Sequence, residues 1–175
     1  GTAGTIFWNT GDERDERGHI DENPTNRTRM MEKRMKKLEL VEKEIPASEK
    51  FNFFGNMDGA VTVVSWGSPK GAILEAKERL QADGTKINFL QVRLVHPFPA
   101  ADVSRLLSRA KKIIDIEMNY SGQLAGIIRE RTGILVDDLI LKYNGRPMSS
   151  DEVYEAIKSI LVGKAPRRQV LMYGA

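Results

Sequence analysis

A group of polar side chains follows directly after a short apolar run, namely Glu117, Asn119, Ser121 and Gln123. The isoleucines at 113, 114 and 116 are typical of a buried strand, and a helix is expected over residues 123–131. Open α/β sheets place functional groups between the carboxyl end of a strand and the start of the next helix. The pattern therefore predicts a candidate functional rim at residues 117–123.

Glu117 is the member of this group that most needs a partner, because a carboxylate at the end of an apolar strand is costly to bury alone. Asn119 and Ser121 have a simpler alternative role, since either side chain can cap the next helix while Gly122 permits a tight turn. A capping role does not exclude an interface role. Both stay open at this point.

A second candidate loop lies at residues 66–71, Trp-Gly-Ser-Pro-Lys-Gly, between an expected strand and an expected helix. It lacks the spacing of a phosphate-binding P-loop, and Pro69 removes one N–H donor. We favour a tight structural turn over an anion contact. The two histidines, His19 and His96, have no further ligands at metal-binding spacing, and a structural role is favoured for His96.

The bulk composition excludes several classes of protein. The chain has 175 residues, no cysteine and a net charge of only +3, so cysteine-ligated clusters and a global attraction to nucleic acid are not expected. A basic helix face at residues 27–37 is more simply a solvated surface. The absence of cysteine fits a reducing cytoplasm, and the small net charge argues against a nucleic-acid partner. No signal peptide or membrane-length apolar run is found, so no membrane partner is expected. The chain does not begin with methionine, which suggests a fragment, a processed product or a tagged form.

The order of the expected elements predicts the fold. A helix capped by Thr25 or Asn26 runs to about Glu44, before Pro46. The expected strands are 51–54, 60–66, 87–94, 112–117 and 139–143, and the expected helices are 69–80, 101–109, 123–131 and 151–161. Short separation of the first two strands predicts an antiparallel hairpin. Strands alternating with helices predict a three-layer α/β/α domain with a mostly parallel sheet and one antiparallel edge strand, preceded by a linker helix.

Several motifs, taken in order, resemble one enzyme family. They are Val63-Val64-Ser65-Trp66-Gly67-Ser68, Leu94-Val95-His96-Pro97-Phe98-Pro99, Glu117-Met118-Asn119-Tyr120-Ser121-Gly122-Gln123-Leu124, the segment from Gly11 to Ile20, and Arg29-Met30-Met31-Glu32-Lys33-Arg34. Together they resemble the C-terminal region of the alpha subunit of 2-oxoacid:ferredoxin oxidoreductases. The resemblance implies the end of an upstream pyrimidine-binding domain at 1–24, a linker helix at 25–49, a transketolase C-terminal-like domain at 50–163 and a tail at 164–175.

The same resemblance implies an enzyme that decarboxylates a 2-oxoacid on thiamine diphosphate and magnesium, reduces ferredoxin through iron–sulfur clusters, and transfers the acyl group to coenzyme A. Other subunits, of beta, gamma and delta type, are its implied partners. The family's substrate motif, Tyr-Pro-Ile-Thr-Pro, and its diphosphate motif are absent from this sequence. We therefore expect a structural and subunit-interface region that binds no cofactor or metal and is inactive alone.

The implied interface or pocket-adjacent residues are Glu117, Asn119, Ser121, Gln123, Arg14, Asp15 and His19. Glu117 is expected to anchor its turn, with the other three rim residues capping the helix. Relatives commonly have Glu-His-Asp-Glu where this chain has Glu13-Arg14-Asp15-Glu16. If the relatives' histidine helps to shape the substrate or coenzyme A pocket, Arg14 cannot be assumed to do the same. The alternative is a stand-alone α/β module that binds an anion or nucleotide at 67–71 or 121–123. A nucleic-acid-binding protein acting through residues 27–37 is a further, less favoured alternative.

Overall fold

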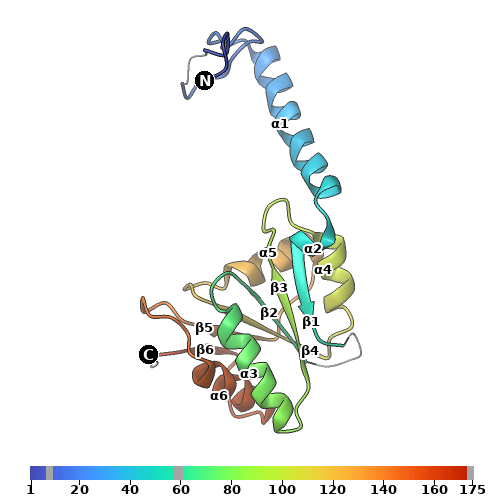
Figure 1. Ribbon diagram of the computed structural model, residues 1–175, viewed down its shortest axis with the longest axis vertical. Helices are drawn as coiled ribbons and strands as arrows, with labels where there is room; N and C mark the ends of the chain where they lie inside the picture. Colours follow the sequence, from blue (N-terminus) through green and yellow to red (C-terminus); the bar gives the residue numbers. More distant parts are fainter. Residues whose placement is uncertain (7–9, 57–60, 173–175) are drawn as a thin grey trace. The chain divides into compact units, whose positions relative to one another are not determined.

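Figure 1 shows a computed structural model of the chain, which describes residues 1–6, 10–56 and 61–172. The chain forms two compact units, Gly1–Ile45 and Pro46–Ala175, each considered by itself below. Within the described ranges, no helix is both long enough and apolar enough to cross a membrane. The sequence has a short apolar patch near its start, Ile6-Phe7-Trp8, and it lies mostly outside the described residues.

The first unit consists of a polar segment followed by the helix α1 (Pro24–Glu44). The expected cap at Thr25 or Asn26 is wrong, because Asn23 is the capping residue and its side chain accepts a hydrogen bond from the Thr25 N–H at 2.9 Å. Pro24 then occupies the first helical position, where a missing N–H costs nothing. The helix ends at Glu44, just before Pro46, as predicted.

The second unit alternates strands and helices. Its strands are β1 (Phe51–Phe54), β2 (Val61–Trp66), β3 (Ile87–Val92), β4 (Lys112–Glu117), β5 (Asp138–Leu141) and β6 (Arg168–Val170). Its helices are α2 (Ala47–Lys50), α3 (Lys70–Ala82), α4 (Ala100–Leu107), α5 (Gln123–Thr132) and α6 (Ser150–Leu161). Most bounds lie within two residues of those expected, and β4 matches them at both ends.

The strands form one sheet in the order β1-β3-β2-β4-β5-β6. Every neighbouring pair is parallel except β1 and β3, which are antiparallel. The chain passes from β2 to β3 on one side, then crosses to β4 on the other side of β2. The carboxyl ends of β2 and β4 therefore form a topological switch point, where α/β sheets place their ligand crevices.

The predicted hairpin between the first two strands is wrong, although the predicted antiparallel edge strand is confirmed. β1 pairs with β3, with Phe51 opposite Val92, and β2 is the central strand between β3 and β4. The physical reason is that the crossover through α3 places β3 beside β2, so the free edge left for β1 is that of β3. A connection of six residues can span one intervening strand. Part of this connection, residues 57–60, lies outside the described residues.

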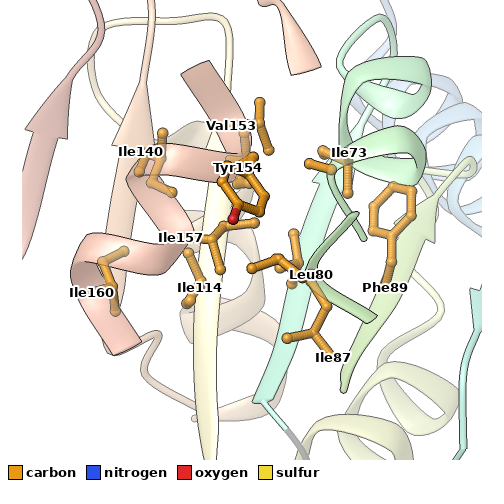
Figure 2. Close-up of a cluster of buried hydrophobic side chains, with 14 of the residues drawn as sticks. Ile73, Leu80, Ile87, Phe89, Ile114, Ile140, Val153, Tyr154, Ile157 and Ile160 are labelled. Atoms are coloured by element: carbon orange, nitrogen blue, oxygen red, sulfur yellow. The ribbon is translucent and has the colours of Figure 1, made fainter. Parts of the chain in front are cut away.

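Helices cover both faces of the sheet, which confirms the three-layer architecture. On one face, α3 and α6 pack against a buried cluster, and Figure 2 shows Ile73 and Leu80 of α3 opposite Ile157 of α6, beside Ile114 of β4. On the other face, α4 and α5 cover a second cluster that includes Val64, Leu90 and Ile113. Burial on both faces explains why apolar residues on β2, β3 and β4 point to either side of the sheet, as Ile113 and Ile114 do on β4.

The C-terminal part of the unit departs from expectation at one point. Ser149 or Ser150 is expected to cap the helix at 151–161, and Ser149 is the residue that caps α6. Glu152 completes a capping box by accepting from the Ser149 N–H. Residues 164–175, expected to be a tail, contribute the strand β6, which pairs with β5 and extends the sheet. A strand of three residues is too short to show a period in the sequence.

Candidate functional site

Glu117 ends β4, and its side chain is fully buried, with four hydrogen-bond donors around the carboxylate. One oxygen accepts from the Trp66 indole N–H at 2.8 Å and from the Asn119 side-chain amide at 2.7 Å. The other accepts from the backbone N–H groups of Leu124 at 2.8 Å and Ala125 at 3.4 Å. Two of these donors belong to the first turn of α5, so the buried carboxylate is satisfied by hydrogen bonds. Glu117 therefore ties the ends of two strands to the start of a helix.

Asn119 holds the turn that follows. Its side-chain oxygen accepts from the backbone N–H groups of Ser121 at 3.2 Å, Gly122 at 2.8 Å and Gln123 at 3.3 Å. Gly122 is buried with φ of +69°, and a β-carbon there would lie 3.1 Å from a methyl group of Leu139, so glycine is needed. The N–H groups at this helix start are thus bound by Asn119 and Glu117.

Ser121 and Gln123 have a different position from their two neighbours. Both side chains are exposed, and among the described residues neither makes a side-chain hydrogen bond within the chain. The expectation that they cap the helix through their side chains is therefore wrong. The Asn119 side chain accepts from the backbone N–H groups at the helix start instead. Their exposure leaves them available to another protein, and the predicted interface role stays a prediction.

A cavity of about 310 Å³ lies at the switch point between β2 and β4. Its lining brings together the two loops singled out in the sequence, and consists of Trp66, Gly67, Ser68, Pro69, Met118, Asn119 and Gln123. An anion at residues 121–123 is disfavoured, because the donors there are used and the Glu117 carboxylate is adjacent. The helix α3 begins directly after Pro69, and no side chain caps it. The hydrogen bonds of Glu117 and Asn119 thus give this edge of the sheet a structural role.

Asp115 is a buried acid that sequence reasoning missed. It lies on β4 two residues before Glu117, is fully buried, and neither carboxyl oxygen has a hydrogen-bond partner among the described residues. Burial, together with the neighbouring Glu117, raises the pKa of Asp115 well above its ordinary value. The available signal was a lone carboxylate inside the run Ile113–Ile116, where every other side chain is an isoleucine.

The remaining predicted residues, Arg14, Asp15 and His19, lie in the first unit and form a compact turn. Asp15 accepts from the backbone N–H groups of Arg17 and His19, each at 2.9 Å, and its carboxylate lies 3.6 Å from the His19 ring nitrogen. The His19 N–H, and then the Arg17 N–H, lower the pKa of the Asp15 carboxyl. The Asn26 side chain donates to the Arg14 carbonyl at 2.9 Å, which joins this turn to α1.

Glu13 completes that connection and was not singled out from the sequence. Its carboxylate binds Arg27 at 2.9 Å and Arg34 at 2.7 Å, both on α1. Arg34, followed by Arg27, lowers the pKa of Glu13 to about 2. Arg29 pairs with Glu16 at 2.9 Å. Three arginines of the basic helix face thus have carboxylate partners, which weakens the case for a phosphate-binding surface.

Replacing Arg34 with glutamine is expected to raise the pKa of Glu13 from about 2 toward its ordinary value, since the strongest partner of the carboxylate is lost. Because the folded pKa lies below the unfolded one, the stabilisation is complete above the unfolded pKa and is lost as pH falls toward about 2. Carbon-detected NMR titration of the full chain measures this midpoint. Arg29→Gln, which removes the partner of Glu16, is the matched control, and an unchanged midpoint in Arg34→Gln would contradict the assignment.

The described residues offer no ligand set for the metal ion or the iron–sulfur clusters that the resemblance implies. In the described ranges, no group of three or more histidine, aspartate or glutamate side chains is arranged to hold a metal ion. The chain contains no cysteine to bind an iron–sulfur cluster. No chemical step is therefore assigned to a cofactor held by this chain.

The sheet order and the two helical layers define the class of protein as a three-layer α/β/α domain with a mostly parallel sheet. A split-gene transketolase, described as an inactive beta4 tetramer, matches 70% of this chain with a TM-score of 0.52 at 16% identity, which supports the fold alone. Residues 59–157 match the family model described as pyruvate:ferredoxin oxidoreductase core domain II. The chain belongs to this family.

Two relatives confirm the resemblance found in the motifs. The alpha subunit of 2-oxoacid:ferredoxin oxidoreductase from Saccharolobus solfataricus is 49% identical over 175 residues, covering 100% of this chain and 27% of the relative. The structure of 2-oxoglutarate:ferredoxin oxidoreductase from Magnetococcus marinus, with 2-oxoglutarate, coenzyme A and succinyl-CoA bound, matches 91% of this chain and 27% of its own, with a TM-score of 0.75 and 29% identity. The chain thus spans about a quarter of the length of these proteins.

Proposed function

We propose that this chain is the C-terminal region of the alpha subunit of a thiamine diphosphate-dependent 2-oxoacid:ferredoxin oxidoreductase. The whole enzyme would convert a 2-oxoacid to its acyl-CoA in the cytoplasm, with reduction of ferredoxin. The support is the family match together with relatives that carry this name over the full length of the chain. In this proposal residues 50–163 form the transketolase C-terminal-like domain and residues 1–24 end an upstream domain.

Within that enzyme, we infer that the second unit is structural and docks other parts of the oxidoreductase through the carboxyl edge of its sheet. The supporting observation is a set of large apolar side chains left exposed where β2, β4, β5 and β6 end, namely Trp66, Met118, Tyr120, Tyr143 and Met172. Tyr120 is 67% exposed, and its ring packs edge-on against Tyr143 with a centroid distance of 5.0 Å. Aromatic residues that stay exposed in one patch are typical of protein interfaces.

The rim residues fit this interface role better than a catalytic one. The Glu117 carboxylate and the Asn119 amide are committed to internal hydrogen bonds, so they are not free to exchange protons with a substrate. Gln123 and Ser121 are exposed beside the aromatic patch and can bond to a partner. By itself the chain is expected to show no reduction of ferredoxin or of a viologen dye, and turnover without partners would contradict the proposal.

Replacing Tyr120 and Tyr143 together with serine is expected to weaken assembly at least tenfold, because aromatic anchors contribute most of the binding free energy at an interface. The variant would be made in the full-length alpha subunit and produced with the other subunits, and complex formation measured by size-exclusion chromatography with light scattering. The thermal midpoint of the chain should change little, since both side chains are exposed.

The matched control is Leu135→Ser, which removes another exposed apolar side chain, before the amino end of β5 at the opposite edge of the sheet. This variant should assemble like the parent. If the tyrosine variant also assembles normally, the carboxyl edge is not the docking surface.

A further inference from the structure

Asp115 is an unusual residue for the centre of a sheet. It pairs with Val64 of β2 on one side and Leu139 of β5 on the other, and its side chain is fully buried. Both of its carboxyl oxygens lack hydrogen-bond partners among the described residues. An ionised carboxylate that is buried without hydrogen-bond donors around it is strongly disfavoured.

Glu117 lies on the same face of β4, because side chains alternate along a strand and two residues separate the pair. In contrast to Asp115, its carboxylate accepts hydrogen bonds from four donors. Two adjacent buried carboxyl groups cannot both carry a charge without strong repulsion. The surroundings thus decide which of them is neutral.

We propose that the folded chain keeps Asp115 protonated beside an ionised Glu117. Loss of this proton at high pH weakens the hydrogen bonds that Glu117 accepts from the start of α5 and from the Trp66 indole. The stored proton makes the carboxyl edge of the sheet sensitive to pH. Deprotonation would place a second negative charge next to Glu117, and repulsion would displace the carboxylate that holds Trp66, Leu124 and Ala125. This inference concerns the chain's own residues and stands apart from the proposed oxidoreductase function.

No other charged group compensates Asp115 within the described part of the fold. The elements packed on this face present apolar side chains, from Val64 of β2, Val103, Leu106 and Leu107 of α4, Leu124, Ala125 and Ile128 of α5, and Leu139 of β5. Lys112, on the same strand, binds Asp138 at 2.7 Å near the amino ends of β4 and β5. Lys142 binds Glu152 of α6, the helix that covers the opposite face. A proton therefore remains the means of neutralising Asp115.

The first test is the pH dependence of stability, measured by urea unfolding of the full chain and of Asp115→Asn. A group whose folded pKa is raised contributes stability that is complete below the unfolded pKa and is lost as pH rises through the folded pKa. Relative to Asp115→Asn, the folding constant of the parent chain should fall about tenfold per pH unit between those two values. Glu130→Gln, which removes an exposed carboxylate on α5, should leave the profile unchanged.

The second test reports on the rim directly. The sequence contains two tryptophans, Trp8 and Trp66, so Trp8→Phe leaves Trp66 as the single emitter. Its fluorescence should shift at alkaline pH in that background and should not shift when Asp115→Asn is added. Infrared spectroscopy of the Trp8→Phe chain at neutral pH should show the carbonyl stretch of a protonated carboxylic acid. Absence of that band, or equal pH dependence with and without Asp115, would overturn the proposal even if the asparagine variant folds poorly.

Discussion

Replacing Lys142 with alanine is expected to lower the free energy of unfolding by about 3–5 kcal/mol, the range measured when one partner of a buried ion pair is removed. The Lys142 side chain is 0% exposed, and its ammonium binds both oxygens of Glu152, at 2.7 and 2.9 Å, as well as the Pro147 carbonyl at 2.8 Å. Alanine would leave the Glu152 carboxylate, with a side chain only 13% exposed, without this cation. The same carboxylate completes the capping box of α6, so the helix start would also weaken.

Urea unfolding at neutral pH measures the change, and Lys86→Ala, which truncates an exposed lysine in the same unit, is the control. Lys142→Met combined with Glu152→Gln should recover part of the loss, because the second substitution removes the uncompensated charge. A change below about 1 kcal/mol in Lys142→Ala, the size typical of a surface pair, would show that the ion pair does not stabilise the fold.

Replacing Glu117 with alanine is expected to be the second large effect, at about 3 kcal/mol, since hydrogen bonds to a charged group contribute about 1.5–3 kcal/mol each and the partners are buried or half-buried. The variant would leave the Trp66 indole N–H and the N–H groups of Leu124 and Ala125 without their acceptor. Unfolding by urea and the fluorescence of Trp66 both report the change.

Gln123→Ala separates stability from assembly at the same rim. Its side chain is exposed and makes no hydrogen bond within the described residues, so the free energy of unfolding should stay within about 0.5 kcal/mol. Assembly with the other subunits should weaken if Gln123 faces a partner. An assembled Glu117→Ala enzyme that has lost decarboxylation alone would instead place this rim in the chemistry.

These expectations change how the polar rim is understood. By position, at the topological switch point and above a cavity, residues 117–123 resemble an active-site edge. By hydrogen bonding, Glu117 and Asn119 join β2, β4 and α5 into one rigid corner. A corner held in this way can present Tyr120 and Gln123 to a partner with little loss of conformational entropy on binding.

The sequence alone determined the features that depend on residues close together in the chain. The bounds of β4, the start of α5 at Gln123 and a serine cap for α6, at Ser149 or Ser150, were all predictable, because periodicity and capping act over a few residues. The layered α/β class followed from the alternation of such elements. That Glu117 needs a partner followed from the cost of burying a carboxylate after an apolar run.

Only the tertiary structure decided which distant residues meet. Trp66 reaches Glu117 across 51 positions, and β1 pairs with β3 because the crossover through α3 had already occupied the edge of β2. Lys142 finds Glu152 only once α6 folds back over β5. Strand order and the choice of partners depend on which edges and faces remain free after the chain has crossed the sheet. Local hydrophobic periodicity does not determine either of them. For the same reason, the two unlike environments of Asp115 and Glu117 became visible only in the folded sheet.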